Sequence, residues 1–324
     1  MELPWGILTG VRPVKIVNEL MDDGYGEDVI YEILKNEYLL SKQKAMLIIE
    51  VAKNQRRFIW PLKEDRYNLY VNIPFCPTRC IYCSFPSNSI EQAKNYIDEY
   101  TKCVIYELKH MSQLLKGKKI NTVYIGGGTP TSIPIKNLES IISSIYELFG
   151  NENINEITVE AGRPDTLNMD MLKMLKAYEI DRISINPQSM NQSTLRLIGR
   201  YHTNKDVIDA FNLAREIGFN LINMDIIVGL PGEGIDELTY TLDAISKLRP
   251  ENLTVHTLAI KRGSKFISNL DMYSLTDGNT ISNMLKLCGE YAENMGLKPY
   301  YLYRQKQMLG NYENIGYSLD DREC

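Results

Sequence analysis

The 324-residue chain carries 41 acidic and 36 basic residues, and its net charge of −5 gives no long-range attraction to nucleic acid or to an anionic membrane. Hydrophobic residues make up 44% of the chain and charged residues 24%, which is the composition of a globular protein with a large core. No apolar run approaches the roughly 20 residues of a membrane span, and no signal-peptide core follows "MELPWGILTG". We therefore expect a cytoplasmic protein with no membrane span and no nucleic-acid partner.

The first part of the chain is predicted to be helical. Residues 12–57 show helical apolar spacing, Gly24 and Gly26 interrupt the pattern, and Ser41 is a plausible N-cap. From Tyr67 onward, short β-rich runs alternate with longer amphipathic helical patterns. The predicted strands cover residues 67–73, 121–126, 156–161, 181–186, 220–229 and 252–259. The predicted helices lie near residues 90–115, 136–149, 167–178, 191–216, 235–247 and 278–295.

Six alternating βα units predict parallel strands, in either a doubly wound sheet or a closed or partial barrel. The pattern alone does not choose between these two architectures. In both of them ligands bind at the carboxyl ends of the strands. Polar or glycine-rich segments fall at these ends, so we treat them as candidate site residues.

Three cysteines follow the first predicted strand, in the stretch "YVNIPFCPTRCIYCSF". Cys76, Cys80 and Cys83 have the spacing C-x3-C-x2-C, whereas the other three cysteines are scattered along the chain. Iron–sulfur clusters are held by cysteine thiolates, and four are used when the cluster only carries electrons. Three thiolates leave one metal position open, as catalytic zinc sites do. A structural zinc site is the competing interpretation, but it needs a fourth ligand, and the three histidines show no ligand-like spacing with each other or with the remaining cysteines.

The motifs around this loop carry a family resemblance. "CPTRCIYC" resembles the C-x3-C-x-[YF]-C signature of the radical S-adenosylmethionine (SAM) superfamily. "YVNIPFC", "GGGTPT", "NPQS" and "NMDIIVGLPG" together look like the oxygen-independent coproporphyrinogen III oxidase/dehydrogenase (HemN-like) family within it. "PWGILTGVRP", "EAGRPDT" and "YYLYRQK" resemble its HemZ subgroup. The resemblance extends over essentially the whole chain.

The resemblance implies the cofactors, the fold and the domains. Cys76, Cys80 and Cys83 would hold a [4Fe–4S] cluster, and SAM would bind the fourth iron and be cleaved to a 5′-deoxyadenosyl radical. The implied fold is α/β, a partial (β/α)6 TIM-like barrel. We expect an N-terminal helical segment (1–62), the radical SAM core (63–298) and a C-terminal extension (299–324). Related chains begin before "PWGILTG" and continue past "REC", which leaves open that the chain is a fragment.

The resemblance also implies the SAM contacts, while the catalytic residues stay unknown. "GGGTPT" is a turn whose backbone N–H groups can approach a ligand closely. Glu160, Gln188 and Asp225 lie in or just after apolar strands, where a polar side chain needs a hydrogen-bond partner. That partner could be the ligand or, as the alternative, another group of the protein core. "EAGRP" is one residue longer than the family's common E-x-x-P form. The implied SAM-binding residues are Tyr70, Tyr82, Gly127, Gly128, Thr129, Glu160, Gln188, Arg200, Asp225 and Ala259.

The implied reaction is the oxidative decarboxylation of two propionates of coproporphyrinogen III to vinyl groups, giving protoporphyrinogen IX. The implied partners are a tetrapyrrole substrate and an electron donor such as flavodoxin or ferredoxin. Two groups of aromatic or basic residues could hold a tetrapyrrole or form solvated loops: Tyr300, Tyr301, Tyr303, Arg304 and Lys306, and Lys261, Arg262 and Lys265 after the sixth strand. Asn72 and Phe85 stand where the coproporphyrinogen enzymes have histidine and a fourth cysteine. A haem-binding chaperone on the same scaffold is the main alternative, but "ENIGYS" (313–318) lacks the haem-ligating histidine of those relatives.

Overall fold

The computed structural model describes residues 4–10, 12–61, 63–267 and 273–324. By its internal contacts the chain forms two units. The first unit comprises Met1–Leu62, Ile226–Lys261 and Leu270–Cys324, and the second comprises Lys63–Asp225 and Arg262–Asn269. The predicted boundary at Leu62 lies outside the described residues, and the division into three domains stays a prediction.

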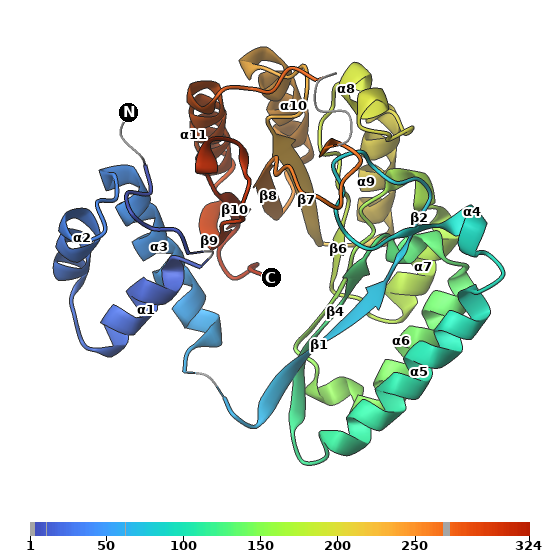
Figure 1. The fold of residues 1–324 in the computed structure, drawn as a ribbon. Coiled ribbons are helices and arrows are strands. Elements are labelled where there is room, and N and C mark those ends of the chain that lie inside the picture. The colour runs from blue at the N-terminus through green and yellow to red at the C-terminus, as the bar shows by residue number, and fades with distance from the viewer. Residues whose placement is uncertain (1–3, 11, 62, 268–272) are drawn as a thin grey trace. The chain divides into compact units, whose positions relative to one another are not determined.

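The second unit is a parallel sheet with helices on one face (Figure 1). Its main strands are β1 (Arg66–Ile73), β4 (Lys119–Gly127), β5 (Glu156–Val159), β6 (Arg182–Ser184) and β7 (Leu221–Val228), whose last residues belong to the first unit. They pair in parallel in the order β1-β4-β5-β6-β7. This order follows the chain and does not reverse, as it would in a doubly wound sheet.

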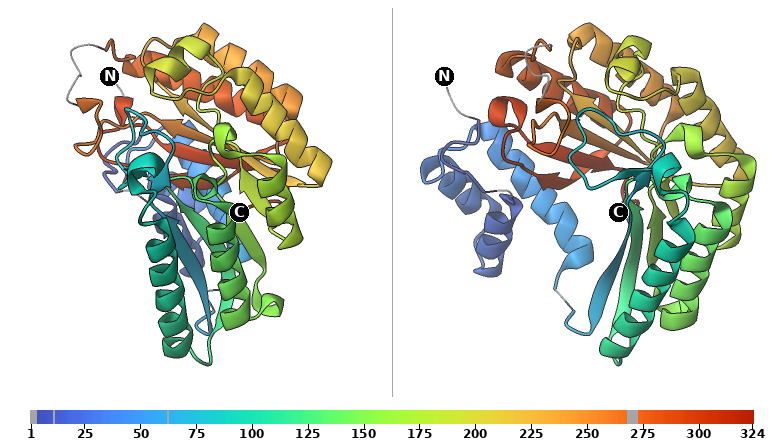
Figure 2. Two further views of the ribbon diagram at one scale, coloured as in Figure 1. Left: turned by 90° about the vertical axis from the view of Figure 1, so that its right-hand side faces the viewer. Right: turned by 45° about the vertical axis from the view of Figure 1, so that its right-hand side comes forward.

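The helices of the second unit connect these strands. They are α4 (Ile90–Ala93), α5 (Ile97–Leu114), α6 (Ile135–Phe149), α7 (Met169–Ala177), α8 (Gln192–Leu197) and α9 (Asn204–Ile217). Helices α5, α6 and α7 lie side by side on one face of the sheet (Figures 1 and 2). In α6, buried apolar residues recur at 138, 141, 142 and 145, which places them all on the face that packs inward. The short elements are β2 (Phe75–Cys76), β3 (Asn88–Ser89), η1 (Pro130–Ser132), η2 (Asn151–Asn153) and η3 (Pro164–Thr166).

The first unit contains the N-terminal helices and the C-terminal strands. Helices α1 (Val14–Asp22) and α2 (Glu27–Asn36) pack on α3 (Lys42–Ile59), and α3 packs against β9. Ser41 caps α3 as predicted, because its side chain accepts a hydrogen bond from the Lys44 N–H. The end of β7 is followed by α10 (Ile235–Leu248), β8 (Asn252–Thr257), α11 (Gly278–Asn294), β9 (Lys298–Tyr303), η5 (Leu309–Asn311) and β10 (Asn314–Ser318).

The six predicted βα units are confirmed in chain order, but two of the predicted helices are each divided in two. The helix expected near 90–115 consists of α4 and α5. The single helix expected over 191–216 is two helices, because the chain turns at Gly199 (φ +79°) and Thr203 and Asp206 form a capping box that starts α9. The aromatic and basic stretch after α11 is the strand β9, where a solvated loop was the alternative. Strand β10 pairs antiparallel with both β8 and β9. No helix among the described residues combines the length and apolar character needed to cross a bilayer.

Candidate iron–sulfur and SAM site

The cysteine loop follows β1 and begins at β2. All three of its thiols are free; Cys80 is buried, and Cys76 and Cys83 are partly buried. Burial raises the pKa of both Cys76 and Cys83, and the nearby Cys80 raises them further. The three sulfur atoms are therefore close enough to interact electrostatically.

Backbone hydrogen bonds hold this loop in place. The Cys83 N–H donates to the Cys80 carbonyl (3.2 Å), and the Ile81 N–H donates to the Ile198 carbonyl after α8 (3.1 Å). A cluster places each thiolate on a different iron atom, whereas zinc needs its ligands around one point. Among the described residues, no three His, Cys, Asp or Glu side chains are gathered closely enough to hold a single metal ion, and this includes the cysteines of the loop.

The glycine turn after β4 lies directly against the cysteine loop. A Cβ atom on Gly128 would lie 2.6 Å from the Phe75 carbonyl oxygen and 3.0 Å from Cys76 Sγ, and the Thr129 hydroxyl lies 3.5 Å from that same sulfur. Only glycine fits at position 128 without displacing the loop.

The N–H groups of this turn already have acceptors. The Gly127 N–H donates to Glu160 Oε2 (3.0 Å). The Gly128 N–H donates to the Ile73 carbonyl (2.9 Å), and the Thr129 N–H donates to the Phe75 carbonyl (2.7 Å). The expected contact through backbone N–H groups therefore has to be revised.

Glu160 lies at the end of β5 and connects two strands. Its Oε1 accepts from the Tyr124 hydroxyl (2.6 Å), while its Oε2 accepts from the Gly127 N–H. Tyr70 stacks on Tyr124 with a ring-centroid distance of 5.8 Å, and it remains 58% exposed. Partial burial and the charge of Glu160 raise the pKa of Tyr70, so its hydroxyl stays protonated at neutral pH. The exposed ring leaves a surface on which a flat group can stack.

Gln188, in the segment after β6, and Asp225, within β7, lie together. The Gln188 N–H donates to the Asp225 carbonyl (2.9 Å). The Asp225 carboxylate accepts from Asn186 (2.7 Å) and Asn223 (2.6 Å). The buried Gln188 Oε1 has no hydrogen-bond partner among the described residues, which costs about 1–3 kcal/mol unless a ligand donates to it. This acceptor fits a ligand with hydrogen-bond donors, as SAM is. Sequence reasoning missed Asn186, although "NPQS" marked the segment.

Arg200 is brought into this group by the break between α8 and α9. It is only 6% exposed, and its guanidinium donates to the carbonyls of Gly162 (3.3 Å) and Asn186. Burial acts to lower the pKa of Arg200, but the nearby Tyr82 hydroxyl and Cys80 thiol outweigh it and raise the pKa. A solvated surface arginine, the usual alternative, is therefore excluded.

The predicted site residues thus belong to the second unit, with one exception. Ala259 belongs to the first unit, where it forms a β-bridge with Met308. The first unit also contains Arg304, which had been a candidate for holding a tetrapyrrole. Arg304 is buried, donates to the carbonyls of Leu8 (2.7 Å) and Asn311 (3.2 Å), and lies over the Trp5 ring. It stabilises the N-terminal segment in this arrangement.

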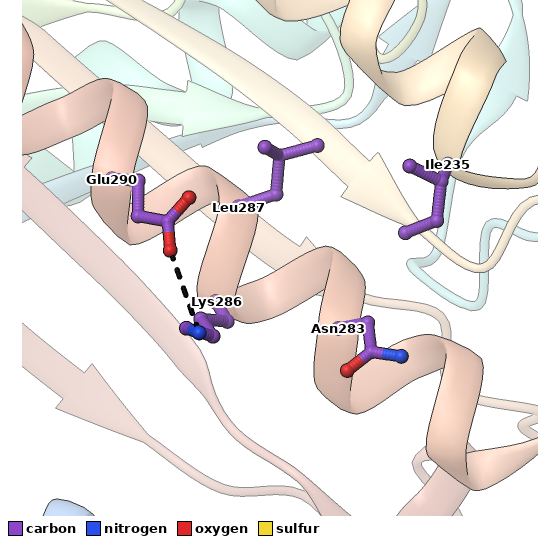
Figure 3. Close-up of a pocket in the computed structure, with 5 residues that line it drawn as sticks. All are labelled: Ile235, Asn283, Lys286, Leu287 and Glu290. Atoms are coloured by element: carbon purple, nitrogen blue, oxygen red, sulfur yellow. Dashed lines mark ion pairs between the residues drawn. The ribbon is translucent and has the colours of Figure 1, made fainter.

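A small cavity of about 280 Å³ lies in the first unit, between α10 and α11 (Figure 3). Lys286 and Glu290 form an ion pair there (3.7 Å). The cavity is lined by Ile235, Asn283, Lys286, Leu287 and Glu290, and none of these is a predicted site residue.

One loop with three free cysteines follows the first strand of sequential βα units, and polar groups lie at or near the neighbouring strand ends. This arrangement fits a protein that holds an iron–sulfur cluster beside a small ligand. The chain belongs to the radical SAM superfamily, because residues 70–245, more than half of its length, match that family. Its cofactors are a [4Fe–4S] cluster and SAM, which this family uses. The predicted family and the expected cofactors are confirmed.

The relatives place the chain more finely. It is 42% identical to the oxygen-independent coproporphyrinogen-III oxidase-like protein HemZ of Bacillus subtilis, over 98% of this chain and 65% of that protein. It is 33% identical to the heme chaperone HemW of B. subtilis, over 61% of this chain and 52% of that protein. The chain thus spans about two thirds or less of the length of these relatives.

A solved structure agrees with the predicted fold. Coproporphyrinogen III oxidase (HemN) from Escherichia coli superposes with a TM-score of 0.66 at 24% identity, over 83% of this chain and 59% of that one. The chain therefore has the α/β fold of the radical SAM family, and the predicted partial barrel is confirmed.

Proposed function

We propose that the chain is the radical SAM core of an enzyme that converts two propionates of coproporphyrinogen III to vinyl groups, giving protoporphyrinogen IX. Support comes from the 42% identity to HemZ over 98% of the chain. The observation that carries the chemical part is the cysteine loop, in which Cys76 lies against the glycine turn and Cys80 lies near Arg200. In each propionate the reaction removes CO2 and one hydrogen atom, and a further electron must leave.

The cluster and SAM, when bound, supply the one-electron chemistry that abstracts a substrate hydrogen atom. The residues of this chain bind and orient these groups. Cys76, Cys80 and Cys83 would hold three irons. The Gln188 carboxamide would accept a hydrogen bond from the ligand, and the exposed ring of Tyr70 offers a stacking surface.

We further propose a reduced tetrapyrrole as the substrate and flavodoxin or ferredoxin as the electron donor. All six cysteines are free thiols. Free thiols suit the reducing cytoplasm, where we expect the protein to work.

A haem chaperone is the second candidate, because the chain is 33% identical to HemW over 61% of its length. The segment 313–318, where the chaperones carry a haem-ligating histidine, contains none here. It lies in and beside β10, whose five residues are all buried, and Glu313 is fully buried as well. Ligation of haem there lacks its commonest donor.

The test is anaerobic incubation of the reconstituted chain with reductant, SAM and coproporphyrinogen III, followed by chromatography of the porphyrins after oxidation. Vinyl-bearing products in the wild type, absent in a Cys80→Ala variant, are the expected result. Deoxyadenosine without vinyl products would remove the proposed substrate and leave the family assignment intact. Tight haem binding with neither product would favour the chaperone.

A further inference from the structure

Arg163 is an almost fully buried cation beside the cysteine loop, in the segment that follows β5. Only 3% of the Arg163 surface is exposed. Its Nε and Nη2 donate to the two carboxylate oxygens of Asp165, at 2.9 and 2.8 Å. A two-point ion pair of this kind fixes the plane of the guanidinium. The remaining nitrogen, Nη1, is therefore aimed in one direction.

That nitrogen reaches the cysteine loop. Arg163 Nη1 lies 3.1 Å from Thr78 Oγ1 and 3.4 Å from the Thr78 carbonyl oxygen. Thr78 stands between Cys76 and Cys80, and its hydroxyl donates in turn to the Gly199 carbonyl (2.9 Å). The arc between the first two cysteines is thus joined at one residue to the segment after β5 and to the turn between α8 and α9.

The charge of Arg163 also acts on the loop. Its almost fully buried guanidinium lies 3.1 Å from the Thr78 hydroxyl, between Cys76 and Cys80 in sequence, and the Asp165 carboxylate balances its charge. A buried charge acts through a low dielectric, so it is weakly screened by salt. Without Arg163 the Asp165 carboxylate would stand unbalanced beside the loop, which would disfavour additional negative charge on a group bound there.

We propose that Arg163 is a positioning residue for the iron–sulfur cluster: through Thr78 it holds the Cys76–Cys80 arc ready to bind, and its charge raises the reduction potential of the bound cluster. The inference rests on the assignment of the cluster to the three cysteines and is independent of the tetrapyrrole substrate. A lysine could not replace this arginine fully, because it offers one nitrogen where the site uses three.

The test uses the whole chain, reconstituted anaerobically, in four variants. Arg163→Lys keeps the charge and loses the planar fork, Arg163→Gln loses both, and Thr78→Val removes the hydroxyl while keeping the side-chain shape. Arg57→Lys is the matched control, because Arg57 is a half-exposed arginine paired with Asp321 in the first unit. The readouts are the rate of iron release to a chelator and the midpoint potential of the cluster, titrated by electron paramagnetic resonance.

We expect all three site variants to release iron roughly tenfold faster than the wild type, because each loses about one charge-assisted hydrogen bond. Only Arg163→Gln should shift the potential, toward more negative values. Release rates and potentials equal to those of Arg57→Lys would overturn the proposal. If the Arg163 variants fail to fold, Thr78→Val decides through its release rate. A wild type that binds no iron would overturn the cluster assignment itself, so the two failures are distinguishable.

Discussion

Replacing Gly128 with alanine tests how tightly the glycine turn packs against the cysteine loop. The new Cβ atom would lie 2.6 Å from the Phe75 carbonyl oxygen and 2.9 Å from the Phe75 nitrogen, whereas ordinary contact begins at 3.4 Å. The oxygen would have to retreat by about 0.8 Å, the difference between 3.4 and 2.6 Å. Both atoms belong to the backbone, so no side-chain rotation relieves the overlap. Overpacking of this kind typically costs about 1–3 kcal/mol.

The displaced residue immediately precedes Cys76, so the shift should also move a cluster ligand. We expect Gly128→Ala to lower the free energy of unfolding of the iron-free protein by about 1–3 kcal/mol in urea titrations. The reconstituted variant should also bind clearly less than the roughly four irons of a complete cluster. Gly10→Ala is the matched control, because nothing lies within 4 Å of the added Cβ atom. Stability and iron content equal to those of the control would refute the packing argument.

Two further predictions concern buried charge. Burial and the charges of Arg200 and Arg163 lower the pKa of His202 to about 4 in the folded chain, from 6.5 in the unfolded chain. Between these two pH values the unfolded chain binds the proton and the folded chain does not. The free energy of unfolding should therefore fall by about 2 kcal/mol between neutral pH and pH 5. In urea titrations, His202→Gln should reduce this pH dependence, and an unchanged pH dependence in the variant would contradict the prediction. Lys44 forms an ion pair with the fully buried Glu313. Lys44→Met should therefore lower the free energy of unfolding by about 3–5 kcal/mol, and the double variant with Glu313→Gln should regain part of this loss. An unaltered urea midpoint for Lys44→Met would contradict the prediction.

The sequence was sufficient to predict the six βα units, because each strand and helix carries its own periodicity. It was not sufficient for the C-terminal strands β9 and β10. All five residues of β10 are buried, so the strand lacks the alternation that marks a half-exposed strand. Its antiparallel pairing depends on residues far away in the sequence, which no local pattern reveals. The break after α8 was readable in principle, because Gly199 and the pair Thr203 and Asp206 are helix-ending and helix-starting signals.

The cysteine loop was predictable because three cysteines with the spacing of metal ligands fall within eight residues. The residues that support it were harder to recognise. Arg163 and Asn186 act through partners on other segments, Thr78 and Asp225 respectively. An isolated arginine or asparagine after a strand has many uses, and only the folded chain shows which partner it meets. The same holds for Gln188, whose unpartnered oxygen becomes apparent only when its burial is known.

The central claim is that three thiolates hold a cluster that cleaves SAM. The most direct measurement is the iron content of anaerobically reconstituted protein, together with 5′-deoxyadenosine formed after addition of SAM and reductant. The wild type should bind about four irons and form deoxyadenosine, and Cys76→Ala, Cys80→Ala and Cys83→Ala should each lose both properties. Iron content and SAM cleavage that persist in any of these variants would contradict the account.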